Sequence, residues 1–134
     1  MNVSEVLNRA ADLIEERGWS TGSGWTDDGV SPLCLEGALA SVLGLPMIVH
    51  GCDAYRAVSS YIGDGRPLFL WNDNAAWETN NWRSNRLRVP RDYTASKEAG
   101  RQVVIETLRA AAVIQASHEA ETDVRAVSPR EVSA

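Results

Sequence analysis

Apolar residues recur at three- and four-residue intervals in two long stretches of the chain, one at its beginning and one near its end. The first stretch comprises Val3, Val6, Leu7, Ala10, Leu13 and Ile14. This spacing places the apolar side chains on one face of a helix. Asn2 and Glu5 fit an N-cap with its capping-box partner, and Gly18 fits the stop. The pattern therefore predicts a helix over residues 3–17.

The second long stretch predicts the last helix. It begins near Thr94 or Ser96 and continues to about residue 120. Its expected buried side is formed by Val103, Val104, Thr107, Leu108, Ala111 and Ile114. We expect this helix to pack against residues 3–17 in the core. Residues 121–134 contain few large apolar side chains, so they form a polar tail that either frays or continues the helix.

Two shorter helices are predicted between them. Ser31 and Pro32 fit the N-cap and first position of a helix that ends at Gly44. Asp53 fits the cap of a helix over residues 54–62. Residues 66–73 have no clear period and predict either a short strand or an extended buried segment.

These elements predict a mainly α, compact domain of about four helices with long irregular connections. The chain has 134 residues, which is the size of one domain. We expect residues 1–120 to form it, with a Trp-, Arg- and Asn-rich loop inserted at 75–93. The apolar runs are far shorter than the roughly 20 residues that cross a bilayer. The acidic N-terminal stretch is unlike a secretory signal. Together these features predict a cytoplasmic protein without membrane contact.

Metal-ligand residue types come close together in the sequence at Cys34, His50 and Cys52. A structural zinc site needs four ligands, and here the fourth would have to be Asp53 or His118. The His-x-Cys pair departs from the usual ligand spacings, and free cysteines commonly pack as small apolar residues. We therefore expect neither a metal nor another cofactor.

Cys34 also falls in the first turn of a predicted helix, where the helix dipole lowers the pKa of a thiol. With His50 as base and Asp53 as orienting group, it would form a nucleophile. Nothing in the spacing brings the three together, so the sequence does not predict an enzyme. A small thiol or metal protein using Cys34, His50 and Cys52 stays the least favoured alternative.

Charge is distributed unevenly along the chain. Residues 1–79 carry 4 basic and 11 acidic groups, whereas residues 80–101 carry 6 basic and 2 acidic groups. Aromatic residues interleave with these arginines, and Trp, Tyr and Arg dominate binding hot spots. We predict a partner-binding surface on residues 77–101, formed by Trp77, Trp82, Arg83, Arg86, Arg88, Arg91 and Tyr93. A protein partner is favoured; the same mixture could stack single-stranded nucleic acid, or the tryptophans could simply cover the core.

Four short motifs carry a family resemblance. They are Leu13–Trp19, Cys34–Leu39, Trp71-Asn72-Asp73 and Val103–Ala111. Together they resemble a family of small uncharacterised domains of actinobacteria and their phages. In that family the four motifs read, in the same order, R-G-W, C-x-x-G-A, W/F-N-D and a final helix with L-x-x-A-A. The family passes from W-N-D to the last helix quickly, whereas residues 75–93 intervene here. The resemblance implies a shared fold and transfers no activity.

The expected function is that of a non-enzymatic interaction protein, encoded by a phage or mobile element, that binds a host or phage macromolecule. The alternative is a nucleic-acid-binding accessory protein using residues 77–101. Twelve of the 13 basic residues are arginine, as the codon usage of a GC-rich genome would produce.

Overall fold

The computed structural model describes residues 1–21, 28–48, 50–75 and 93–133. Its helices are α1 (Val3–Arg17), α2 (Leu35–Leu43), α3 (Asp53–Ile62) and α5 (Tyr93–Ser133). A further helical stretch covers residues 68–75, and the described residues contain no strand beyond a single bridge between Trp19 and Leu33. The predicted mainly α fold is confirmed. None of the helices in these ranges is long and apolar enough to span a membrane.

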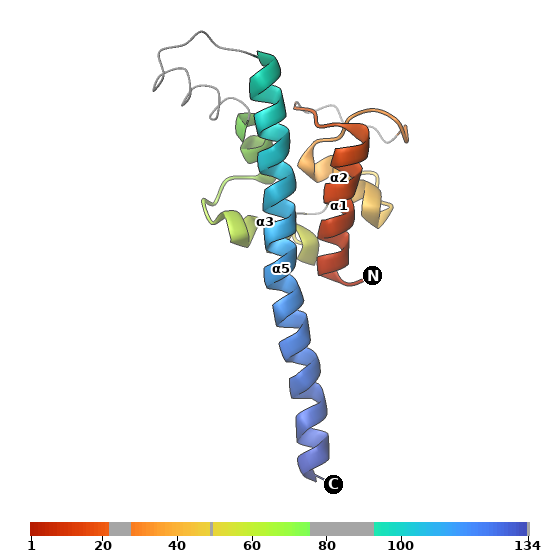
Figure 1. The fold of residues 1–134 in the computed structure, drawn as a ribbon. Helices are drawn as coiled ribbons and strands as arrows, with labels where there is room; N and C mark the ends of the chain where they lie inside the picture. Colours follow the sequence, from red (N-terminus) through yellow and green to blue (C-terminus); the bar gives the residue numbers. More distant parts are fainter. Residues whose placement is uncertain (22–27, 49, 76–92, 134) are drawn as a thin grey trace.

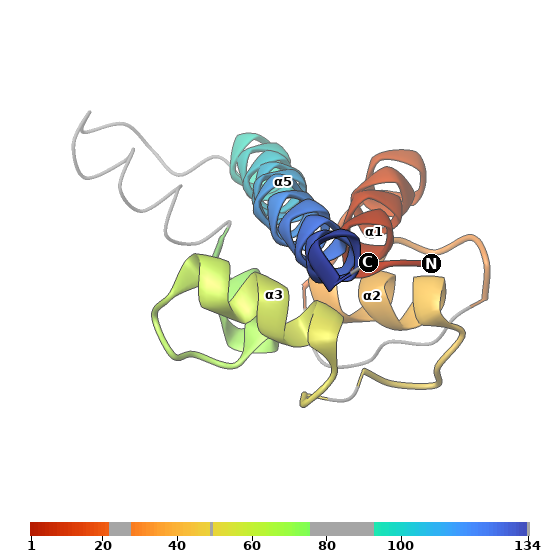
Figure 2. The same ribbon diagram turned by 90° about the horizontal axis from the view of Figure 1, so that it is seen from below.

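The helices form two layers, with α1 and α5 in one and α2 and α3 in the other (Figures 1 and 2). α1 and α5 run antiparallel. Polar contacts connect them along their length: Ser4 donates to Glu119, Arg109 donates to Asp12, and Arg101 donates to the Glu15 carbonyl. The predicted packing of residues 3–17 against the last helix is therefore confirmed.

The core lies between the layers. Its largest fully buried side chains include Leu7, Ile14, Trp19, Leu39, Leu68 and Leu108. Burying each contributes roughly 1.5–3 kcal/mol. Leu13 and Trp71 are only partly buried against this core.

The predicted start of α2 is wrong. Its N-cap is Cys34, and Ser31 and Pro32 precede the helix. The reason is a tertiary one. The Leu33 amide donates to the Gly18 carbonyl, and the Leu33 carbonyl accepts from the Ser20 amide. These two hydrogen bonds hold the backbone extended at Leu33, so the helix begins only after it.

Two further boundaries differ from the prediction. The N-cap of α3 is Cys52, with Asp53 as the first helical residue. Residues 68–75 are helical, not a strand or an extended segment. The carbonyl of Pro67 accepts from the amides of Leu70 and Trp71, which opens that helix. Among the apolar residues 68–71, Leu68 is fully buried and the other three are not, because the helix turns the side chains that follow Leu68 toward solvent.

α5 continues through the predicted tail to Ser133. Figure 1 shows it extending past the N-terminal end of α1, with no other described helix beside it. Over residues 121–133 the helix continues, which is one of the two outcomes expected for the tail.

Candidate functional site

A groove with a volume of about 440 Å³ lies between α3 and α5. Its apolar lining comes from Val3, Ala57, Tyr61, Ala111 and Ile114. Its polar lining comes from Asp53, Arg56, Ser60, Gln115 and His118. The groove therefore offers a partner both apolar surface and hydrogen-bonding groups.

Two large apolar side chains in this groove are accessible to solvent. Tyr61 on α3 is 45% exposed and Ile114 on α5 is 46% exposed. The expectation that Ile114 is buried is wrong, because Ile114 lies at the edge of the core face of α5, where α3 leaves it uncovered. The core face is formed by Val104, Ile105, Leu108, Ala111 and Ala112, and Val103 and Thr107 are half-buried beside it.

The charges of the groove largely offset one another. Arg56 lies 3.8 Å from Asp53, one turn earlier on α3, and both side chains are mostly exposed. Exposed pairs of this kind contribute little to stability, so both groups stay accessible to a partner. His118 stands on the α5 wall.

The sequence motifs meet elsewhere, at one buried amide. Asn72 is fully buried, and its Oδ1 accepts from Trp19 Nε1 at 2.7 Å and from the Leu35 amide at 3.0 Å. Its Nδ2 donates to the Ser20 carbonyl at 3.1 Å and to Asp73 Oδ1 at 3.2 Å. Asn72 thus connects the loop after α1, the start of α2 and the 68–75 helix.

This arrangement explains three of the shared motifs physically. R-G-W supplies Trp19, C-x-x-G-A supplies the first turn of α2, and W-N-D supplies Asn72. The side chain of Asn72 accepts from the first amide of α2, so it helps to cap a helix that lies 37 residues away in the sequence. These residues hold the fold together.

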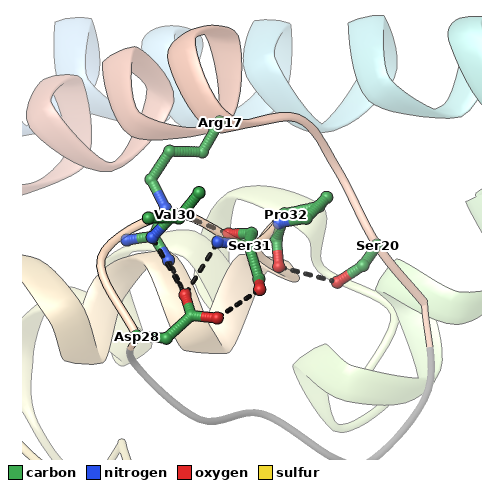
Figure 3. Close-up of polar contacts among 6 residues, drawn as sticks. All are labelled: Arg17, Ser20, Asp28, Val30, Ser31 and Pro32. Atoms are coloured by element: carbon green, nitrogen blue, oxygen red, sulfur yellow. Dashed lines mark hydrogen bonds and ion pairs between the residues drawn. The ribbon is translucent and has the colours of Figure 1, made fainter.

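A second polar cluster joins Arg17 at the end of α1 to residues 28–31 (Figure 3). Asp28 accepts from the amides of Val30 and Ser31, at 2.9 and 2.7 Å, and from the Ser31 hydroxyl. Arg17 lies 3.5 Å from Asp28 and donates to the Ser31 carbonyl at 3.0 Å. The hydrogen bonds from Ser31 and Val30, with Arg17, hold the pKa of Asp28 well below its usual range.

Cys34 does not have the environment of a nucleophile. Its thiol is buried and accepts from the Gly37 amide at 3.3 Å, as part of the cap of α2. Burial raises the pKa of Cys34, and the charges of Glu36 and Asp73 add to the rise. The expectation of a lowered pKa is therefore wrong, because desolvation outweighs the helix terminus.

His50 contacts a carboxylate and an aromatic ring, not the thiol of Cys34. Its Nε2 lies 3.4 Å from Glu36 Oε1, and its ring stacks on Tyr55 with 4.6 Å between centroids. Cys52 is the N-cap residue of α3 without a side-chain hydrogen bond to the helix, and His118 lines the groove on α5. In the part of the chain that the structure describes, no three His, Cys, Asp or Glu side chains gather as a metal site would require.

The predicted partner-binding surface falls almost wholly outside the described residues. Trp77, Trp82, Arg83, Arg86, Arg88 and Arg91 lie there, as does the side chain of Tyr93, the first residue of α5. At the described end of the 77–101 range, Lys97 is exposed, whereas Arg101 contacts Glu98 and the Glu15 carbonyl. The surface stays a prediction.

Sequence reasoning missed the groove. The signal in the sequence is a small residue followed about one turn later by a large one on each helix: Ala57 and Tyr61 on α3, and Ala111 and Ile114 on α5. The small residues leave space beside the large ones. That signal becomes readable only when the two helices are known to be neighbours.

The model of a family of unknown function, DUF6197, matches residues 1–114. Because the match covers most of the chain, the chain belongs to this family. The matched residues include α1 to α3 and the part of α5 that packs in the core, and the match ends before the extension of α5. No curated protein and no solved structure matches the chain.

Proposed function

We propose that this member of the DUF6197 family is a non-enzymatic interaction protein, which holds an amphipathic helix of a partner protein in the groove between α3 and α5. The observation that carries the proposal is the exposure of Tyr61 and Ile114, one on each of the two helices that line the groove. A groove between two helices, with accessible apolar side chains, suits a third helix that presents residues at i, i+3 and i+4.

The lining also indicates the chemistry of the partner. Tyr and Arg are enriched among residues that dominate binding energy, and Tyr61 and Arg56 both stand in the groove. Because Asp53 and Arg56 carry opposite charges, a suitable helix has a central apolar stripe with polar residues of both signs beside it. Its binding would change only modestly with salt, since few net charges are neutralised.

The setting of this interaction is part of the proposal. The arginine bias supports an origin in a GC-rich actinobacterium or one of its phages, and the partner is then a host or phage macromolecule in the cytoplasm.

Nucleic acid is the second candidate, because residues 80–101 carry 6 basic and 2 acidic groups. Binding there would use the arginines and stacked tryptophans, and it would weaken steeply as the salt concentration rises.

The test is capture of a partner from extracts of the native host, followed by titration with a helical peptide from the partner identified. Ile114→Glu puts a charge into the groove at a site that is already exposed, so the fold should be retained. Met47→Glu is the matched control, since Met47 is 70% exposed and does not line the groove. We expect Ile114→Glu to abolish capture and Met47→Glu to leave it intact.

A second variant separates the two candidate surfaces. It replaces Trp82, Arg83, Arg86 and Arg88 with alanine. If it abolishes capture in the folded protein while Ile114→Glu does not, the partner binds residues 77–101 and the groove proposal is wrong. A captured nucleic acid with steep salt dependence would favour the second candidate.

A further inference from the structure

The outer face of α5 changes from polar to apolar at the point where the helix leaves the domain. Gln102 and Glu106 are exposed on this face. Val113, one heptad after Glu106, is 69% exposed, and Ala116 and Ala120 follow it as exposed positions. By helical period Val113 and Ala120 lie away from the core face and from Ile114 and His118 in the groove, and Ala116 lies one turn after the buried Ala112, at the border of the core face.

The sequence continues this spacing at Val124 and Val127, within the helical range of α5. The five positions 113, 116, 120, 124 and 127 are separated by three, four, four and three residues. This order reads the same from either end, with Ala120 at its centre. An antiparallel pair of identical helices with its twofold axis at Ala120 would set position 113 opposite 127 and 116 opposite 124. Every apolar position would then meet another.

We propose that α5 pairs with the α5 of a second copy of this chain, antiparallel and centred on Ala120. A symmetric dimer needs a surface that is complementary to itself, and a palindromic stripe meets that condition. A partner with an unrelated sequence would not require it.

The length of the extension fits the same pairing. Residues 121–133 continue past Glu119, whose carboxylate accepts from Ser4 of α1. In the proposed register they lie along residues 107–119 of the partner's helix, so each domain covers the other's extension. This supplies the tertiary packing from which most helices gain their stability.

The expected dimer is weak and dissociates on dilution. Its apolar stripe is about 20 Å long, at a rise of about 1.5 Å per residue. An interface of one helix pair falls at the small end of specific interfaces, where transient complexes are found.

Sedimentation of the full-length chain over a range of concentrations tests the pairing. We expect a monomer–dimer equilibrium in the wild type. Ala120→Glu sets two like charges opposite each other at the twofold axis and should weaken association by at least about tenfold. Ala120 is exposed, so the domain itself should stay folded, and helix content by circular dichroism should fall only by what the extension of α5 loses with its partner. Gln102→Glu, on the same face but beyond the overlap, is the control and should associate like the wild type.

Cysteine cross-linking tests the direction of pairing, in a Cys52→Ser background. Val113→Cys and Val127→Cys chains should form a mixed disulfide when combined, whereas neither should link to itself. A monomer at all concentrations, association unchanged by Ala120→Glu, or self-linking of Val113→Cys would each overturn the proposal. Ile114→Glu should leave dimerisation intact, so failure of the groove proposal and failure of this one are separate results.

Discussion

Replacing Asn72 with alanine should destabilise the fold more than any other single polar substitution in the described core. Asn72 is fully buried, and its side chain makes four hydrogen bonds to three segments of the chain. In Asn72→Ala, Trp19 Nε1 and the Leu35 amide both lose their acceptor inside the protein.

The magnitude follows from these two donors. A buried donor left without a partner costs about 1–3 kcal/mol, so the pair costs roughly 2–6 kcal/mol. Small domains are stable by about 5–15 kcal/mol in total. For a chain of this length the melting temperature should then fall by about 10 °C or more. Asn74→Ala, at a half-buried position two residues further on, is the control and should cost much less.

Urea denaturation of Asn72→Ala, Trp19→Phe and the double variant measures the coupling directly. Because Trp19→Phe removes the same indole donor, the double variant should lose less than the two single losses combined. Asn72→Asp keeps an acceptor but buries a carboxylate beside Asp73, so it should be least stable at neutral pH and recover partly in acid. A loss under about 1 kcal/mol in Asn72→Ala would refute this account of the fold.

Three further outcomes are expected. Leu108→Ala should lower the free energy of unfolding by about 2–5 kcal/mol, and Leu13→Ala by less because Leu13 is only partly buried; equal losses in urea denaturation would contradict the packing. Burial raises the pKa of Glu36 above its ordinary 4.5, so the folded state binds this proton more tightly than the unfolded state. Stability should therefore fall as pH rises from 4.5 through the raised pKa, and Glu36→Gln should flatten that part of the stability profile; an unchanged profile would count against the burial argument. A thiol reagent should modify the half-buried Cys52 first and the buried Cys34 only slowly until the protein is unfolded, so rapid labelling of Cys34 would overturn this expectation. Elemental analysis should find no stoichiometric zinc; zinc that is present and is lost in Cys34→Ser would contradict this.

Local sequence determined the helices that depend on neighbouring residues alone. The spacing of Val6, Leu7, Ala10 and Ile14 places them on one buried face of α1, and this spacing can be recognised whichever helices cover that face. Asn2 accepts from the Glu5 amide at the start of α1, and the Gly18 amide donates to Ile14 at its end. Caps and helical period act within a few residues, so the sequence shows them directly.

Tertiary structure decided the features whose partners lie far away in the chain. Asn72 and Trp19 are 53 residues apart, and Asn72 and Leu35 are 37 apart, so no local pattern indicates that they share a hydrogen-bond network. The start of α2 depends on Leu33 pairing with the segment after α1. The exposure of Ile114 depends on where α3 lies beside α5. A hydrogen bond or a groove between distant segments exists only once the fold has brought them together, and for that reason the candidate site could not be predicted from sequence.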